Sequence, residues 1–151
     1  MAQLFVTPVP VLQPLPVLCI ALTSQLSLQV RTDRKRQVID ITPIIGPHVP
    51  GGLTGLAAVT VLHTTAAITT ADLDPGTDLD LLDALDRLIP DRAWRHPHNP
   101  EHAPDHLLSS IVGPSVVVPV ADGQLVLGTW QRIILLEFDG PRSRSVRVNF
   151  L

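Results

Sequence analysis

Residues 115–138 read SVVVPVADGQLVLGTWQRIILLEF, and the fold class follows mainly from their pattern. It contains three successive strand candidates, at 115–120, 124–130 and 133–138, with no helical pattern between them. The Asp-Gly pair at 122 and 123 is a strong signal for a tight hairpin turn between the first two. The stretch therefore predicts an antiparallel sheet.

Further strand candidates lie on both sides of this stretch. Residues 27–32 and 37–42 alternate apolar and polar side chains, the period of a half-buried strand, and the charged residues 33–36 between them predict a turn. We expect these two segments to form a hairpin. Residues 43–52 are interrupted by Pro and Gly and predict a loop or one short helical turn. The remaining candidates are 56–63, 66–73 and 145–150.

One helix is clearly indicated, beginning near Thr77. Thr77 or Asp78 is expected to cap it, and Pro90 is expected to end it. Its apolar side chains recur at helical spacing and form one face, made of Leu81, Leu82, Leu85, Leu88 and Ile89. Residues 106–113 predict only one or two further helical turns.

These patterns predict an α+β protein with a mostly antiparallel sheet or sandwich and one main helix, since strands and helices do not alternate. The 151 residues suffice for one domain with a substantial core, which we assign to residues 23–151. Residues 1–22 are apolar and rich in proline. We expect them to form an extended arm, or an extra edge strand that packs on a neighbour, because prolines interrupt any signal peptide or membrane helix there.

Charge and cysteine content narrow the function classes. A formal net charge of -3 argues against a nucleic-acid binder, which usually carries a basic face. Arginines cluster within 31–36 and 142–147 and could bind anions, although such runs are more often solvated edges. The single cysteine, Cys19, excludes an internal disulfide and sits in an apolar run as a small hydrophobe. A reducing, cytoplasmic location is expected, with no membrane partner.

Histidines are the main candidates for chemistry. His63 ends a buried strand candidate, where a titratable side chain indicates either a site or a hydrogen-bonded core histidine. Four more lie within residues 94–106, WRHPHNPEHAPDH, namely His96, His98, His102 and His106. The spacing of His102 and His106 would suit a zinc pair on a helix, but Pro104 between them argues against a helix through both. A solvated loop is the alternative for each of these four residues.

Three other groups are candidate site residues. The segment 128–131 places Thr129, Trp130 and Gln131 after a glycine, as a stacking surface and an amide, or else as a strand bulge. Glu137 ends a buried strand candidate and could orient a histidine or act as a base. Ser110, beside Ser109, could bind an anion through backbone N–H groups.

Taken in order, these residues resemble the YjbQ-like family, also called UPF0047. The similar segments run from about Ser27 to the C-terminus. They are HTTAA at 63–67, DP at 74–75, a helix ending LIP, WRH at 94–96, HLLSS at 106–110, GPS at 113–115, DGQLVLGTWQ at 122–131, and Glu137.

The resemblance implies a small α+β domain that assembles as a homotrimer, and a secondary thiamine-phosphate synthase activity. Such an enzyme joins a thiazole phosphate to a pyrimidine pyrophosphate and releases pyrophosphate. His63, His96 and His106 match family positions and are expected to ligate a divalent metal, zinc or similar, or to move protons. Arg95 is expected to meet phosphate. Glu137 would orient a histidine, and Trp130 and Gln131 would line the pocket.

The chain also departs from the family pattern. The acidic run before the DP motif is shorter here and reads TTADL at 69–73, and the usual lysine of the HLLSS-like motif is Leu108. His98 and His102 are additions of this chain. These changes raise a second interpretation, a metal- or small-ligand-binding trimer without catalysis.

Overall fold

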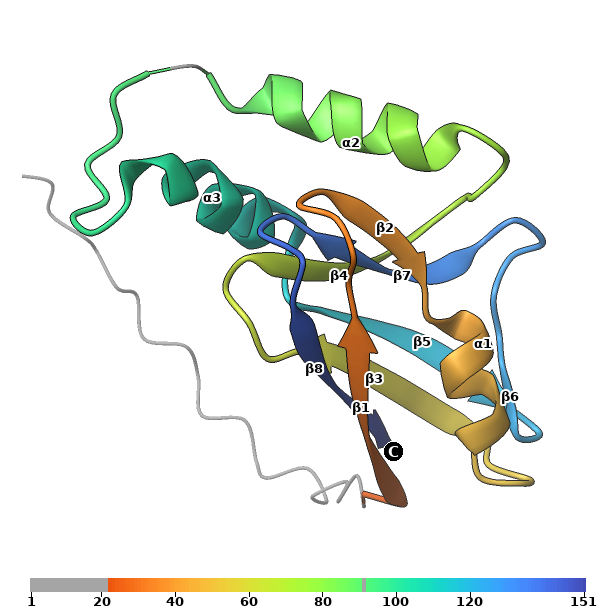
Figure 1. Cartoon of the computed structure of the whole chain (residues 1–151). Coiled ribbons are helices and arrows are strands. Elements are labelled where there is room, and N and C mark those ends of the chain that lie inside the picture. Colours follow the sequence, from red (N-terminus) through yellow and green to blue (C-terminus); the bar gives the residue numbers. More distant parts are fainter. Residues whose placement is uncertain (1–21, 91) are drawn as a thin grey trace, which may run out of the picture.

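The computed structural model of the chain describes residues 22–90 and 92–151. Its strands form two antiparallel sheets (Figure 1), one in the order β1-β8-β3-β5-β6 and one in the order β2-β7-β4. The predicted arm, Leu22 excepted, lies outside the described residues, and so does Cys19. The strands are β1 Ser24–Arg31, β2 Gln37–Asp40, β3 Gly55–Val61, β4 Ala66–Ala71, β5 Ser115–Ala121, β6 Gln124–Leu125, β7 Arg132–Glu137 and β8 Ser143–Phe150.

Strand β7 lies in the middle layer of the molecule. Ile133 and Leu135 pack toward the five-stranded sheet, whereas Ile134 and Leu136 pack toward the helices. A strand that is covered on both faces has no polar side, which explains the unbroken apolar run of this segment. The mostly antiparallel α+β fold predicted from residues 115–138 is confirmed.

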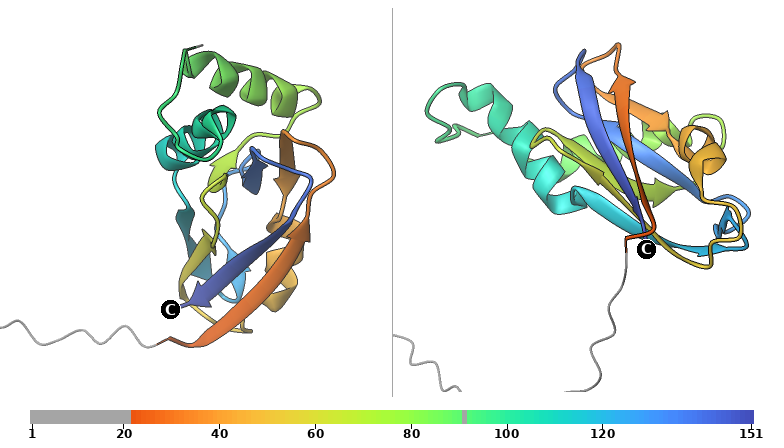
Figure 2. Two further views of the ribbon diagram at one scale, coloured as in Figure 1. Left: turned by 60° about the vertical axis from the view of Figure 1, so that its left-hand side comes forward. Right: turned by 90° about the horizontal axis from the view of Figure 1, so that it is seen from below.

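Helices α2 Thr77–Leu88 and α3 Ala103–Val112 lie together at the end of the molecule opposite the C-terminus (Figure 2, left). The short segments α1 Thr42–Ile45, η1 Gly46–His48 and η2 Pro100–His102 complete the helical structure. Helix α2 ends before Pro90 as predicted, but its N-cap is Gly76 rather than a side-chain cap, and Leu88 of the predicted apolar face is exposed. No described helix is long and apolar enough to cross a bilayer.

The predicted hairpin of 27–32 and 37–42 is wrong. Strand β1 pairs with β8 along its whole length, and β2 pairs with β7 in the other sheet. Alternation specifies one buried face for each strand, but it does not choose the strand's neighbour. The β1–β2 connection instead crosses between sheets beside the β7–β8 connection, where Gly140 N–H donates to Lys35 O at 3.1 Å.

Two other segments differ from the prediction. The strand expected at 124–130 stops at Leu125, because a turn follows in which the Gly128 N–H donates to Gln131 Oε1 at 3.0 Å. Helix α3 is ten residues long, so the protein has a second substantial helix. Pro104 lies in its first turn, where proline is tolerated because no intrahelical N–H bond is lost.

A buried ion pair joins the two sheets at one corner. Arg144 of β8 and Glu137 of β7 are 2% and 0% exposed, and the Arg144 guanidinium donates to both carboxylate oxygens. The Thr32 hydroxyl donates to Glu137 Oε2 at 3.0 Å, and the Asp139 N–H donates to Glu137 Oε1 at 2.8 Å. Every carboxylate oxygen is therefore satisfied without water.

Breaking this pair is expected to be costly, whereas removing both charges is not. Arg144→Met should lower the free energy of unfolding by about 3–5 kcal/mol, because it leaves the Glu137 carboxylate buried without a counter-charge. Glu137→Leu should do the same for Arg144. Urea denaturation of both single variants and of the double variant should give a loss for the double variant well below the sum, with a coupling of about 2–3 kcal/mol. Additive losses would contradict this account.

Candidate functional site

A polar pocket of about 470 Å³ opens where the end of β3, helix α3 and the start of β8 meet. We call it the histidine pocket. Its lining combines three histidines, two arginines, one carboxylate and three hydroxyl side chains, namely His63, Thr64, Thr65, His102, His106, Asp139, Arg142, Ser143 and Arg144. Two of the histidines predicted to form a site, His63 and His106, therefore meet here although they lie far apart in the sequence.

The turn at 63–65 is fixed by one partner at each of its residues. His63 Nε2 accepts the Ser145 N–H at 2.8 Å. Thr64 O lies 3.0 Å from His106 Nδ1, and Thr65 Oγ1 accepts from Arg144 Nη2 at 2.9 Å. Because strand β8 and helix α3 both hold the turn, its side chains are preorganised before any ligand arrives.

The hydrogen bond to Ser145 sets the tautomer of His63. A backbone N–H can only donate, so Nε2 is unprotonated and the remaining donor of the neutral ring is Nδ1–H. Burial lowers the pKa of His63 below its ordinary value of 6.5, and the neighbouring Arg144 lowers it further. His63 is therefore a neutral imidazole at pH 7 that offers one N–H donor.

His106 has the same Nδ1–H tautomer, but its other nitrogen is the one left free. Its Nδ1 faces the carbonyl oxygen of Thr64, which can only accept, so Nδ1 is protonated and Nε2 of the neutral ring has a free lone pair. The ring of His96 stacks on it with centroids 5.3 Å apart and planes 12° apart. His96 is in turn fixed because its Nδ1 accepts the Asn99 N–H at 3.3 Å. The stack holds the His106 ring in one orientation.

Asp139 organises the charged side of the pocket. Its carboxylate binds Arg142 Nη2 at 2.7 Å, and its backbone carbonyl accepts from Arg142 Nε at 2.7 Å. His102 Nε2 lies 3.7 Å from the other carboxylate oxygen. His102 thus lines the pocket, whereas His98 is exposed outside it.

Other predicted site residues lie elsewhere. Gln131 lies beside Thr70, because its Nε2 donates to Thr70 Oγ1. Thr70 is five residues from Thr65 of the pocket wall, and five residues of extended strand span about 17 Å. Thr129 and Trp130 are therefore also remote from the histidine pocket. Arg95 is exposed and does not line the pocket. The Ser110 hydroxyl donates a hydrogen bond to the His106 carbonyl within helix α3.

The predicted metal ligands do not form a coordination set in this arrangement. Among the described residues, no group of three or more His, Cys, Asp or Glu side chains is placed to share an ion. The lone pairs of His63 Nε2 and His96 Nδ1 already accept backbone N–H groups, from Ser145 and Asn99. Glu137, predicted to orient a histidine, pairs with Arg144.

Sequence reasoning missed Asp139, Arg142 and Arg144 as site residues. The cluster of arginines at 142–147 was a signal, but spacing alone did not separate its members. In the alternating strand β8, Arg144 points into the core, whereas Arg147 is exposed. Arg142 precedes the strand, and its guanidinium is held in the pocket by the Asp139 carboxylate.

The lowered pKa of His63 has a consequence for stability. As pH falls through 6.5, the unfolded chain takes up a proton that folded His63 resists, so the free energy of unfolding should fall. We expect His63→Gln to lose part of this pH dependence in urea denaturation between neutral and acidic pH. The control His98→Gln, at an exposed position, should retain it. An unchanged pH profile in His63→Gln would rule out the burial of a neutral imidazole.

Comparisons with known proteins agree with this fold. The sequence model described as UPF0047 protein YjbQ-like matches residues 26–151. A UPF0047 protein of Mycobacterium tuberculosis (strain ATCC 25618 / H37Rv) is 44% identical over 128 residues, 82% of this chain and 95% of that protein. A UPF0047 protein of Archaeoglobus fulgidus is 39% identical over 127 residues, covering 83% and 100%.

Solved structures extend this similarity to three dimensions. A hypothetical protein of Aeropyrum pernix K1 is similar at a TM-score of 0.79 and 39% identity, with 85% of this chain and 98% of that chain covered. A YbjQ-like protein of unknown function from Sulfolobus solfataricus P2 is similar at 0.79 and 35%, with 83% and 94% covered. The chain belongs to the UPF0047, or YjbQ-like, family.

Proposed function

We propose that the histidine pocket binds a small phosphorylated molecule and acts on it by acid–base chemistry. The observation that carries this proposal is that the protein's own hydrogen bonds leave a different ring nitrogen free on each of the two histidines. His63 leaves its Nδ1–H free to donate, and His106, whose Nδ1 bonds the Thr64 carbonyl, leaves its Nε2 free. A neutral donor can polarise an oxygen of the ligand while a lone pair accepts a proton, which is the division of roles that acid–base catalysis needs.

The groups around this pair suit an anion. Asp139 engages Nε and Nη2 of Arg142, and within the described residues Nη1 has no partner. The backbone N–H of the exposed Thr64 is likewise free of any hydrogen bond to the described part of the chain. A phosphate group accepts well from both kinds of donor. The paired carboxylate keeps Arg142 in place and also limits the pocket's net positive charge.

Binding of a simple anion tests the first part of the proposal. Wild-type protein should bind methylphosphonate in calorimetric titration at low ionic strength, and the affinity should fall with added salt. Arg142→Gln should weaken binding by about tenfold, because it removes one charge-assisted contact. Arg147→Gln is the matched control, since that arginine is exposed on the same strand region and lies outside the pocket. No binding, or equal losses in both variants, would refute the anion site.

The specific reaction proposed is of the thiamine-phosphate synthase type, with pyrophosphate as leaving group. Pyrophosphate release from the thiazole phosphate and pyrimidine pyrophosphate precursors should fall about 10²–10⁴-fold in His106→Ala. His98→Ala, which alters an exposed histidine, should leave the rate unchanged. Release by the wild type that is equal in both variants would remove His106 from the mechanism.

One observation favours the non-catalytic alternative. Leu108 replaces the family's lysine and is 1% exposed in the core, so this position supplies no cation to the pocket. Binding of methylphosphonate without any pyrophosphate release would support the alternative. Two other expectations remain predictions, a divalent metal and a cytoplasmic location. Metal analysis of the purified protein tests the first.

We also propose that the chain assembles as a homotrimer. Support comes from apolar side chains on the outer face of β3 and β5, where Leu56 is 38% and Val117 is 56% exposed. Leu62, 52% exposed, continues this surface up to His63. A binding role for Thr129, Trp130 and Gln131, which are remote from the pocket of their own subunit, would require a neighbouring subunit.

Light scattering coupled to gel filtration tests the assembly. The expected mass is three times the 16.3 kDa of the chain. Val117→Lys should produce monomers, because it places a charge in the proposed apolar contact. Leu88→Lys, at a comparably exposed leucine at the end of helix α2 and away from this sheet face, should remain trimeric. A monomeric wild type would overturn the proposal.

A further inference from the structure

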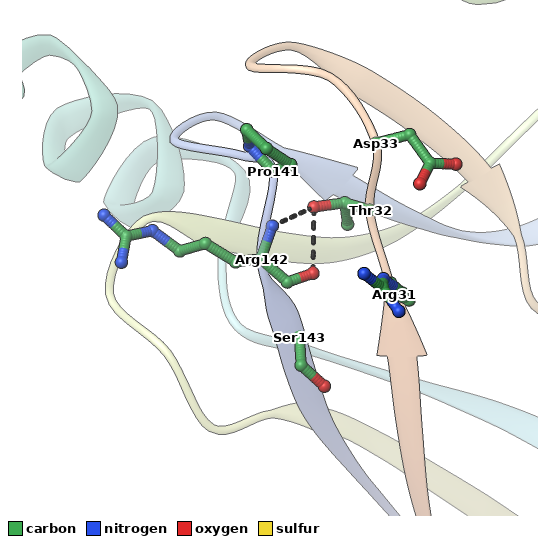
Figure 3. A pocket seen from close by; sticks show the side chains of 6 residues that line it. All are labelled: Arg31, Thr32, Asp33, Pro141, Arg142 and Ser143. Carbon is green, nitrogen blue, oxygen red and sulfur yellow. Dashed lines mark hydrogen bonds between the residues drawn. The ribbon is translucent and has the colours of Figure 1, made fainter.

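We propose that a second anion subsite adjoins the histidine pocket, so that the ligand is an elongated molecule with an anionic group at each end. This inference rests on the proposed function of the histidine pocket and names the ligand class. The second subsite is a pocket of about 440 Å³ that we call the arginine pocket. It is lined by Arg31, Thr32, Asp33, Pro141, Arg142 and Ser143 (Figure 3).

The two pockets share a wall. Arg142 and Ser143 line both of them. Figure 3 shows the Arg142 side chain leaving β8 in the direction away from Arg31, so its guanidinium serves the histidine pocket while its backbone lines the arginine pocket. A ligand that passes over Arg142 and Ser143 therefore reaches both pockets.

Arg31 supplies the arginine pocket with its own cation. It is the last residue of β1, it is exposed, and it lies opposite Ser143 in the strand register. Arg31 makes no ion pair with any described residue, unlike Arg36, Arg132, Arg142 and Arg144. Its guanidinium can thus bind a phosphate or carboxylate group bidentately without first giving up a protein partner.

The floor of the arginine pocket is rigid. The Thr32 N–H donates to Arg142 O at 2.8 Å. The Thr32 Oγ1 accepts the Arg142 N–H at 2.8 Å and lies 3.1 Å from Arg142 O (Figure 3). Gly140 lies so close to this floor that an added Cβ would be 2.9 Å from Thr32 Oγ1. The base of Arg31 is therefore fixed relative to Arg142, and the spacing of the two anionic groups is selected by the protein.

The experiment compares methylphosphonate with α,ω-alkyl bisphosphonates of increasing chain length by calorimetric titration. One chain length should bind at least about tenfold more tightly than methylphosphonate, because the second group binds at high effective concentration. Arg31→Gln should abolish this gain and leave methylphosphonate affinity unchanged. Asp33→Asn should increase the gain, since it removes a negative charge from the arginine pocket.

The outcomes separate this inference from the proposed function. Methylphosphonate binding with no gain at any chain length, or a gain that survives Arg31→Gln, would overturn the second subsite and leave the histidine pocket intact. If no phosphonate binds at all, both the proposed function and the second subsite fail. Arg147→Gln should keep the gain, which excludes a general loss of surface charge as the cause.

Discussion

The buried pair of Arg144 and Glu137 fixes the corner on which the rest of the structure depends. Glu137 belongs to the three-stranded sheet and Arg144 to the five-stranded sheet, so the pair sets how the two sheets meet. Two charges without water are tolerable only when every polar atom has a partner. Thr32, Thr65 and the Asp139 N–H supply those partners, and each belongs to a connection that forms a wall of one of the two pockets. The hydrogen bonds that the buried ion pair needs therefore also hold the walls of the two pockets in place.

The same pair determines the chemistry of the nearest histidine. Burial and the positive charge of Arg144 lower the pKa of His63, while the Glu137 carboxylate acts in the opposite direction. The Ser145 N–H selects the tautomer of His63. Since Arg142 and Arg144 are both paired with carboxylates, ligand recognition depends on a few directed donors more than on a strong overall field. Arg31 differs from these two pocket arginines because it has no carboxylate partner among the described residues.

Much of the fold follows from the sequence because it depends on local patterns. The Asp-Gly turn, the unbroken apolar run of β7 and the proline after α2 each act within a few residues. Strand partners depend on contacts across the whole chain, and so the β1–β2 hairpin was predicted wrongly. Alternation is satisfied equally well by two strands side by side and by two strands that face each other across a core.

The site was only partly predictable, for the same reason. His63 and His106 could be chosen from their motifs. The groups that set their tautomers are backbone atoms, the Ser145 N–H and the Thr64 carbonyl, which no motif specifies. His98 and His102 look equivalent in the sequence. They differ because Asn99 caps the short helical turn Pro100–His102, which leads into α3 and turns His102 toward Asp139, whereas His98 precedes the cap and is exposed. Which histidine joins the pocket is thus decided by where a helix begins.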